Sequence, residues 1–173
     1  GLHGVGASVV NALSTWLEVE VRQDGRLYRQ RFERGDAVYD LKDVGPLEDP
    51  TETGTTVRFK ADPEIFKETT VYEFETLETR LREQAFLNAG VRIVLTDERD
   101  AENVRSEEFH YEGGVSSFVE YLNRSKEKIH PEPIYFAATA ADNNSTCEIA
   151  MQYTDSFNEF ILSFANNIHT VDG

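Results

Sequence analysis

The chain has 173 residues, and 39% of them are hydrophobic, which is enough for a folded core and excludes a disordered chain. No run approaches the roughly 20 apolar residues that a membrane span requires, so we expect no membrane association. The formal net charge of −15 argues against a nucleic-acid surface on this chain, because phosphates are bound by clustered Lys and Arg.

The chain begins with a glycine-rich turn over residues 1–6 and a short helix behind it. Val9, Val10 and Leu13 recur at helical spacing, which predicts a helix over residues 7–14.

Antiparallel strands are predicted next. The dipeptide Asp24-Gly25 is a strong hairpin turn between two segments that alternate as strands do. Strands are therefore predicted over residues 16–21, 27–32 and 55–59, with loops at Gly45-Pro46 and Asp49-Pro50. A short helical turn at 62–64 should then direct Ile65 and Phe66 inward.

A longer helix is predicted over residues 71–89, with Gly90 placed to cap its end. Its apolar face comprises Phe74, Leu77, Leu81, Ala85 and Phe86. The glutamates Glu73, Glu75 and Glu78 are predicted to form its solvent-exposed face.

The second half alternates between strands and one more helix. Strands are predicted over 91–95 and 107–111, a charged turn over 97–105 and a helix from Gly113-Gly114 to about Asn123. The polar, proline-containing stretch 123–133 is typical of a linker, and strands are predicted beyond it over 134–139, 146–153 and 160–165. The chain is therefore predicted to be α+β, with a second, β-rich unit beginning after about residue 130.

The glycine-rich start is the most informative stretch for function. Gly1, Gly4 and Gly6 allow a backbone to approach phosphates closely, and the helix behind them directs free N–H groups at an anion. A tight turn before a helix explains the same residues. Neither a Walker loop nor a Rossmann fingerprint fits, because no Gly-Lys-Ser/Thr follows and no strand precedes.

The whole block from Gly1 to Ser14 resembles the phosphate loop of the GHKL ATPase superfamily, in the form used by bacterial type II DNA topoisomerases. Four further blocks resemble the same family in the same order: residues 53–59, 80–90, 109–123 and 166–173. The block Tyr111-Glu112-Gly113-Gly114 favours the DNA gyrase B family over the B subunits of topoisomerase IV.

This resemblance implies a fold and a domain division. We expect part of a GHKL (Bergerat-type) ATPase α/β sandwich in residues 1–125, followed by the start of a ribosomal-S5-like transducer domain in residues 126–173. Residues up to about Asn123 should form a mixed sheet with helices on one face, and the glycine loop should be mobile. An antiparallel transducer piece should follow Pro133.

The resemblance also implies site residues, cofactors and partners. Gly1, Leu2, His3, Gly4, Val5 and Gly6 match the loop that wraps the triphosphate, and Thr55 matches a threonine that contacts adenine through an ordered water. The implied cofactors are ATP and Mg²⁺. The implied partners are the A subunit of gyrase in an A2B2 heterotetramer, a second B subunit in an ATP-dependent dimer, and double-stranded DNA through other parts of the protein.

No catalytic residue and no metal ligand is assigned within these 173 residues. In the family, the general-base Glu, the Mg²⁺-binding Asn and the Asp-x-Gly-x-Gly segment lie upstream of the glycine loop, and the γ-phosphate lysine lies downstream. The chain therefore looks like an internal piece of a longer protein, and we expect it to hydrolyse ATP negligibly by itself.

Other reactive side chains have simpler interpretations. His110, His130 and His169 lack metal-ligand spacing, and His3 is expected to supply backbone contacts or packing rather than act as a base. Glu107 and Glu108 are neighbours on a strand and should point to opposite faces. Ser8 has no partnered His and Asp arrangement. Trp16 and Cys147 are predicted core residues, and the absence of other cysteines fits a reducing cytoplasm.

Two alternatives stay open from the sequence. Within the superfamily, a histidine kinase, an Hsp90-type chaperone or a MutL-type repair protein would share the glycine loop but should not carry the Tyr111–Gly114 block or the Thr55 strand. The first alternative is therefore the topoisomerase IV counterpart of gyrase B. The other is a non-catalytic acidic interaction module in which the glycine-rich start is only a turn.

Overall fold

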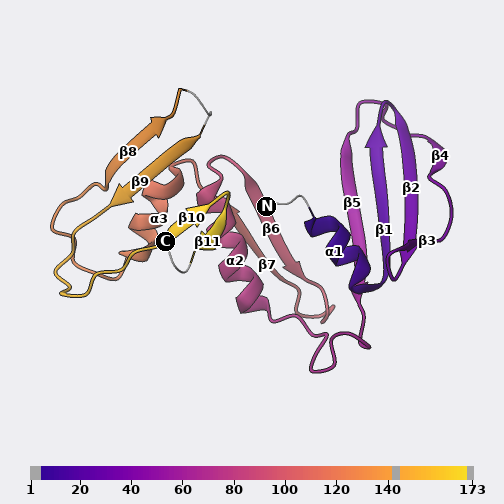
Figure 1. Ribbon diagram of the computed structural model, residues 1–173, viewed down its shortest axis with the longest axis horizontal. Helices are drawn as coiled ribbons and strands as arrows, with labels where there is room; N and C mark the ends of the chain where they lie inside the picture. Colours follow the sequence, from indigo (N-terminus) through magenta and orange to yellow (C-terminus); the bar gives the residue numbers. More distant parts are fainter. Residues whose placement is uncertain (1–4, 142–144, 171–173) are drawn as a thin grey trace. The chain divides into compact units, whose positions relative to one another are not determined.

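The computed structural model describes residues 5–141 and 145–170, and it shows an α+β protein with two compact units (Figure 1). The units divide between Val71 and Tyr72. The predicted α+β class is confirmed. The predicted boundary between an ATPase segment (residues 1–125) and a transducer segment (residues 126–173) is a separate division of the chain, and it stays a prediction.

The first unit is an antiparallel sheet preceded by one helix. Helix α1 (Gly6–Ala12) leads into β1 (Ser14–Gln23), β2 (Arg26–Glu33), β3 (Asp36–Ala37), β4 (Lys42–Pro46) and β5 (Gly54–Ala61). The strand order is β3-β2-β1-β5, and β4 also pairs with β2. All of these pairings are antiparallel, so the mixed sheet predicted from the family resemblance is wrong for this unit.

The β1–β2 hairpin follows the predicted turn. Asp24 and Gly25 have φ values of 52° and 72°, as the two central residues of a type I′ turn require. Gln23 therefore lies opposite Arg26, and the register continues to Leu17 opposite Phe32. This single turn fixes which side chains of β1 and β2 are neighbours.

Two local predictions for the first unit are wrong. Gly45-Pro46 ends strand β4 instead of forming a loop, which is compatible with the position of β4 at the sheet edge. A turn does form after β5, with the Phe66 amide donating to the Asp62 carbonyl at 2.9 Å. However, Ile65 and Phe66 are 48% and 41% exposed, so neither side chain is packed inward.

The described part of the second unit combines two helices with three hairpins. Helix α2 (Phe74–Leu87) is followed by β6 (Arg92–Asp97), β7 (Arg105–His110), α3 (Gly114–Leu122), β8 (Ile134–Thr139), β9 (Thr146–Met151), β10 (Ser163–Ala165) and β11 (Ile168–Thr170). The pairs β6–β7, β8–β9 and β10–β11 are each antiparallel and separate. The antiparallel character predicted after Pro133 is confirmed, and β11 was missed by the sequence prediction.

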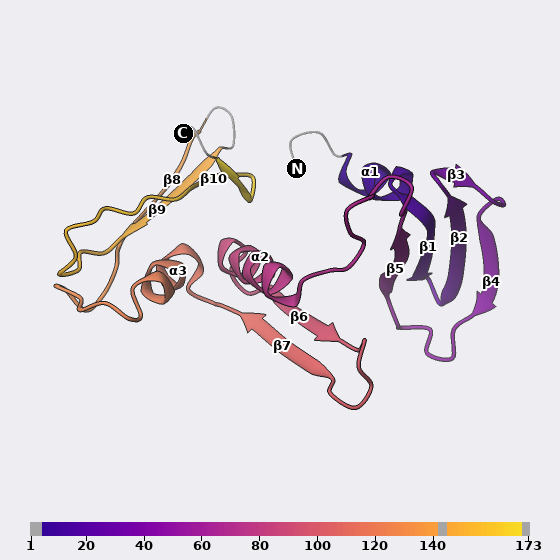
Figure 2. The same cartoon turned by 90° about the horizontal axis from the view of Figure 1, so that it is seen from below.

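Aromatic side chains form the core of the second unit. Phe86 of α2 is 1% exposed and stacks on Tyr111 with ring centroids 3.6 Å apart. Its ring also lies 4.9 Å from that of Phe118 in α3. Helix α2 covers the β6–β7 hairpin and lies beside α3 (Figure 2), which explains why its apolar stripe is buried.

Gly90 is needed for a different reason from the one predicted. Its φ of +81° is the left-handed conformation that glycine adopts readily. Its amide, however, donates to the Tyr111 carbonyl at 3.2 Å, while the Asn88 amide closes the helix on the Gln84 carbonyl at 3.1 Å. Gly90 therefore turns the chain from α2 toward β6 and connects it to the end of β7.

Candidate functional site

The predicted nucleotide-contacting residues fall in three places. Gly1, Leu2, His3 and Gly4, with the predicted mobility of their loop, lie outside the described residues. Val5 and Gly6 stand at the start of α1, and Thr55 is the second residue of β5.

The start of α1 presents backbone N–H groups. The first hydrogen bond inside the helix runs from the Val9 amide to the Val5 carbonyl at 2.9 Å, so the amides of Gly6, Ala7 and Ser8 have no acceptor within the helix. The first turn carries no acidic residue and no side-chain cap. An anion is favoured there by both the free donors and the positive end of the helix dipole.

The surroundings of these amides are open. Within the described residues, nothing lies within 4 Å of where a Cβ on Gly6 would stand, and Val5 is 52% exposed. A phosphate-sized group could therefore approach the start of α1 without displacing any described side chain.

The opposite end of α1 is anchored to the sheet. The Ser14 hydroxyl donates to the Val10 carbonyl at 2.6 Å, and the Asp62 amide donates to the Leu13 carbonyl at 3.0 Å. Asp62 is 1% exposed, and its carboxylate lies 2.9 Å from Nε of Arg34. The helix is thus held at its C-terminal end and open at its N-terminal end.

Thr55 lies opposite Val21, at the start of β5, and its side chain is exposed. Ser14, which follows α1, pairs with Ala61 at the other end of the same strands. In residues 5–141 and 145–170, no hydrogen bond joins Thr55 to Val5 or Gly6. The Thr55 hydroxyl makes no hydrogen bond there either and is available to a ligand.

A buried ion cluster on β1 was missed by the sequence prediction. Glu20 is 8% exposed and accepts hydrogen bonds from Arg29 at 2.5 Å and from Arg58 at 2.9 Å. Those hydrogen bonds lower the pKa of Glu20 below its ordinary value of 4.5, Arg29 contributing most. The register set by the Asp24-Gly25 turn, which places Glu20 opposite Arg29, is the signal that could have predicted the first pair.

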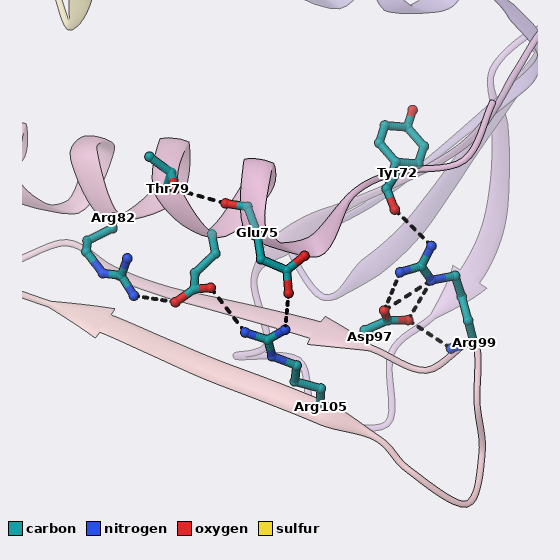
Figure 3. A network of polar contacts seen from close by, with 8 residues as sticks. Tyr72, Glu75, Thr79, Arg82, Asp97, Arg99 and Arg105 are labelled. Atoms are coloured by element: carbon teal, nitrogen blue, oxygen red, sulfur yellow. Dashed lines mark hydrogen bonds and ion pairs between the residues drawn. The ribbon is translucent and has the colours of Figure 1, made fainter. Parts of the chain in front are cut away.

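A second polar network joins α2 to the β6–β7 hairpin (Figure 3). Arg105 contacts Glu75 at 2.6 Å and Glu78 at 3.2 Å, and Glu78 also pairs with Arg82 at 2.5 Å. The Glu78 side chain is only 18% exposed, so the prediction that it lies on the solvent-exposed face is wrong. The hydrogen bond from Arg105 lowers the pKa of Glu75.

The tip of the same hairpin is organised by Arg99, which donates to the Tyr72 carbonyl at 2.8 Å and pairs with Asp97 at 2.5 Å. The hydrogen bonds from the Arg99 side chain and backbone lower the pKa of Asp97 to about 2. These networks are internal ion pairs that bind elements together.

The remaining candidates have structural roles. His110 contacts Glu112 at 2.9 Å, His130 accepts from the Tyr153 amide at 2.9 Å, and His169 packs on Phe164. Within the described part of the chain, no group of three or more His, Cys, Asp or Glu side chains could hold a metal ion. None of the described helices is long and apolar enough to cross a membrane.

Two residues predicted to be in the core are not buried. Trp16 is half-buried, and the Arg31 guanidinium lies over its ring at 5.0 Å. Cys147 is exposed on β9. Both residues lie in strands, as predicted, but neither side chain is buried.

Comparison with known proteins identifies the family. A sequence profile described as DNA gyrase B matches residues 114–173. Over all 173 residues the chain is 54% identical to the DNA gyrase B subunit of Staphylococcus aureus. The chain belongs to the DNA gyrase B family. It is also 53% identical to the homologue from Staphylococcus epidermidis, and it spans 26% of the length of each of these relatives.

Solved gyrase B structures share this fold. The 43K ATPase domain of Thermus thermophilus gyrase B, crystallised with an aminocoumarin, superposes with a TM-score of 0.82 and 37% identity, covering 97% of this chain and 44% of that one. The gyrase B subunit from Myxococcus xanthus gives a TM-score of 0.81 with 30% identity, over 93% and 45%. The family predicted from the sequence is confirmed, and neither alternative is favoured.

Proposed function

We propose that the protein is the B subunit of a bacterial DNA gyrase, an ATP-hydrolysing topoisomerase of the cytoplasm. It would bind ATP with Mg²⁺ and couple hydrolysis to double-strand DNA passage and negative supercoiling. The observation that carries this proposal is the 54% identity to a gyrase B protein over the whole chain. The superposition on a gyrase ATPase domain supports it.

Within this chain, residues Gly1 to Gly6 would bind the triphosphate, and Thr55 would contact the adenine through water. Three features of the described residues fit a nucleotide: the unpaired first-turn amides of α1, the open space at Gly6 and the exposed Thr55 hydroxyl. The Mg²⁺ ligands and the catalytic base are proposed to come from other parts of the intact protein.

The partners follow from the same proposal. The protein would dimerise on binding ATP and assemble with the A subunit of gyrase into an A2B2 heterotetramer. DNA would be contacted by other parts of the protein, consistent with a net charge of −15 on this chain. Residues 1–125 would belong to the ATPase domain and residues 126–173 to the transducer.

Binding of ATP and of adenosine to the full-length protein tests the site. Gly6→Ala should weaken ATP binding about tenfold and leave adenosine binding unchanged, because the added methyl group stands where the phosphates approach. Thr55→Val should weaken the binding of both ligands about fivefold, since a typical hydrogen bond contributes about 1 kcal/mol.

Thr56→Val is the matched control. Thr56 is the next residue on β5, faces the other side of the sheet and accepts a hydrogen bond from Arg22 at 3.0 Å. The ATP affinity of this variant should equal that of the wild type. Equal losses in the two threonine variants would reject the role of Thr55, and failure of the wild type to bind ATP would reject the function.

A further inference from the structure

Two segments that are 79 residues apart in sequence meet at the C-terminal end of α2. The Asn167 side chain donates from Nδ2 to Oδ1 of Asn88 at 2.8 Å. The Gln84 side chain donates from Nε2 to the Asn167 carbonyl at 3.0 Å. These two hydrogen bonds, here called the amide junction, join α2, in the predicted ATPase segment, to the β10–β11 turn in the predicted transducer segment.

Each partner in this amide junction is oriented by its own element. Asn88 donates from Nδ2 to the Gln84 carbonyl at 2.7 Å, which leaves its Oδ1 to accept from Asn167. Asn166 and Asn167 have φ values of 49° and 65°, the left-handed pair of a type I′ turn. That turn directs both the carbonyl and the side chain of Asn167 at α2.

Aromatic packing holds the same hairpin independently. The Phe164 ring of β10 lies 6.2 Å from that of Phe118 in α3, and Phe118 in turn lies 4.9 Å from Phe86 in α2. Ring pairs occur in offset-stacked and edge-to-face arrangements with centroids about 4.5–7 Å apart, whereas hydrogen bonds require a narrower range of distance and angle. The aromatic contacts therefore attach the hairpin, and the amide junction sets its orientation on α2.

We propose that Asn88 and Asn167 are positioning residues that fix the orientation of the β10–β11 hairpin on α2, so that a change in the ATPase segment is transmitted to the transducer. The proposal rests on the proposed function. All groups in the junction are neutral amides, so the junction should respond to neither pH nor ionic strength over the physiological range. A second hydrogen bond, from Nδ2 of Asn123 to Oε1 of Gln152 at 3.2 Å, joins the end of α3 to the residue after β9. It is not part of the amide junction.

Asn167→Gly tests the proposal most cleanly, because glycine suits a φ of 65° and the substitution removes only the side-chain donor. Asn166→Gly is the matched control: it lies in the same turn, with φ 49°, and makes no hydrogen bond to α2 within the described residues. A Gln84→Ala/Asn167→Gly double variant removes both hydrogen bonds of the junction.

The full-length protein, in complex with the A subunit of gyrase, should be assayed for ATP hydrolysis and for supercoils introduced per ATP consumed. Asn167→Gly should keep kcat and KM for ATP near the wild-type values and lose about fivefold in supercoils per ATP. The double variant should lose more, and Asn166→Gly should match the wild type.

Each other outcome counts against the proposal. Equal supercoils per ATP in all variants, equal losses in the two glycine variants, or a parallel loss of ATP hydrolysis and supercoiling would each overturn the positioning role. A wild-type protein that neither hydrolyses ATP nor supercoils DNA would instead reject the proposed function. Hydrogen exchange at Ile168 is expected to accelerate in Asn167→Gly and in the double variant but not in Asn166→Gly, and it reports on the junction independently of activity.

Discussion

The two compact units of this chain are stabilised in different ways. Among the described residues, the buried apolar side chains are Leu17 in the first unit and Phe74, Ala85, Phe86, Phe109 and Phe118 in the second. The buried polar side chains show the opposite distribution, with Ser14, Glu20 and Asp62 in the first unit and Asn123 in the second. The first unit depends on directional contacts and the second on aromatic packing.

This difference follows from the kind of element in each unit. The sheet of the first unit carries cross-strand Glu and Arg pairs on one face, and on its other face Val57 and Phe59 are 52% and 44% exposed. The second unit places α2 between a hairpin and α3, where an apolar helical stripe is covered on both sides. Charge-removing substitutions should therefore affect the first unit most and truncation of an aromatic side chain the second.

The largest effect is expected for Phe86→Ala. The Phe86 ring contacts Tyr111, Phe118 and Tyr121, and it is 1% exposed, so its removal leaves a cavity at the centre of the second unit. We expect a loss of about 4 kcal/mol in the opening free energy of residues 72–170, measured by hydrogen exchange in the full-length protein.

Phe157→Ala is the control, because the Phe157 side chain is fully exposed in the described part of the chain. Its effect should stay below about 0.5 kcal/mol. Similar losses in both phenylalanine variants would show that the second unit has no localised aromatic core.

An intermediate effect is expected for Glu20→Gln in the first unit. Three charge-assisted hydrogen bonds are weakened, two from Arg29 and one from Arg58, which should lower the opening free energy of the first unit by about 2 kcal/mol at pH 7. The folded pKa of Glu20 lies below its ordinary value of 4.5, so its stabilising contribution is complete above pH 4.5 and is lost as the pH falls through the folded pKa. The difference in opening free energy between the wild type and Glu20→Gln should therefore become smaller at acidic pH.

Glu107→Gln is the control for removing the charge of an exposed carboxylate, and it lies on β7 of the second unit. This substitution should change the opening free energy of either unit by less than about 0.5 kcal/mol at any pH. A Glu20→Gln effect that is independent of pH between 7 and 2 would contradict the ionic origin of the stabilisation.

The smallest effect is expected for Arg105→Met, which removes the ion pairs to Glu75 and Glu78 but keeps an apolar side chain over Phe74. The Arg105 side chain is 45% exposed, so solvent screens these pairs, and we expect a loss of about 0.5 kcal/mol at low salt that disappears in 1 M NaCl. A loss that persists in high salt would assign the effect to packing on Phe74 instead.

Much of the secondary structure was predictable, because its signals are local. The Asp24-Gly25 turn, the apolar stripe of α2 and the Gly113-Gly114 start of α3 each depend on residues a few positions apart. Strand β10 lies within the strand predicted over 160–165, but β11 was missed even though Asn166-Asn167 forms a type I′ turn, because β11 is only three residues long. The candidate site was predicted from resemblance, and its contacts to a nucleotide stay a proposal.

Errors occurred where burial depends on distant residues. Ile65 and Phe66 follow a correct turn, yet nothing described covers them. Glu78 belongs to a correct helix, yet Arg105 from another element removes it from solvent. Cys147 lies in a correctly predicted strand, yet its side chain is exposed. The pattern of hydrophobic residues along the chain predicts helices and strands, but it does not predict which face of each element is buried by other elements.

The sequence by itself determined many of the turns, most of the helices and strands, and the family, because each is encoded by short contiguous patterns of residues. Only the tertiary structure decided that Glu20 is buried between two arginines, that Phe86 lies at the centre of an aromatic core and that Asn167 meets Asn88. The physical reason is that burial and hydrogen-bond pairing depend on residues brought together from distant positions. A local sequence pattern shows which residues could be buried or hydrogen-bonded, but it does not identify their partners.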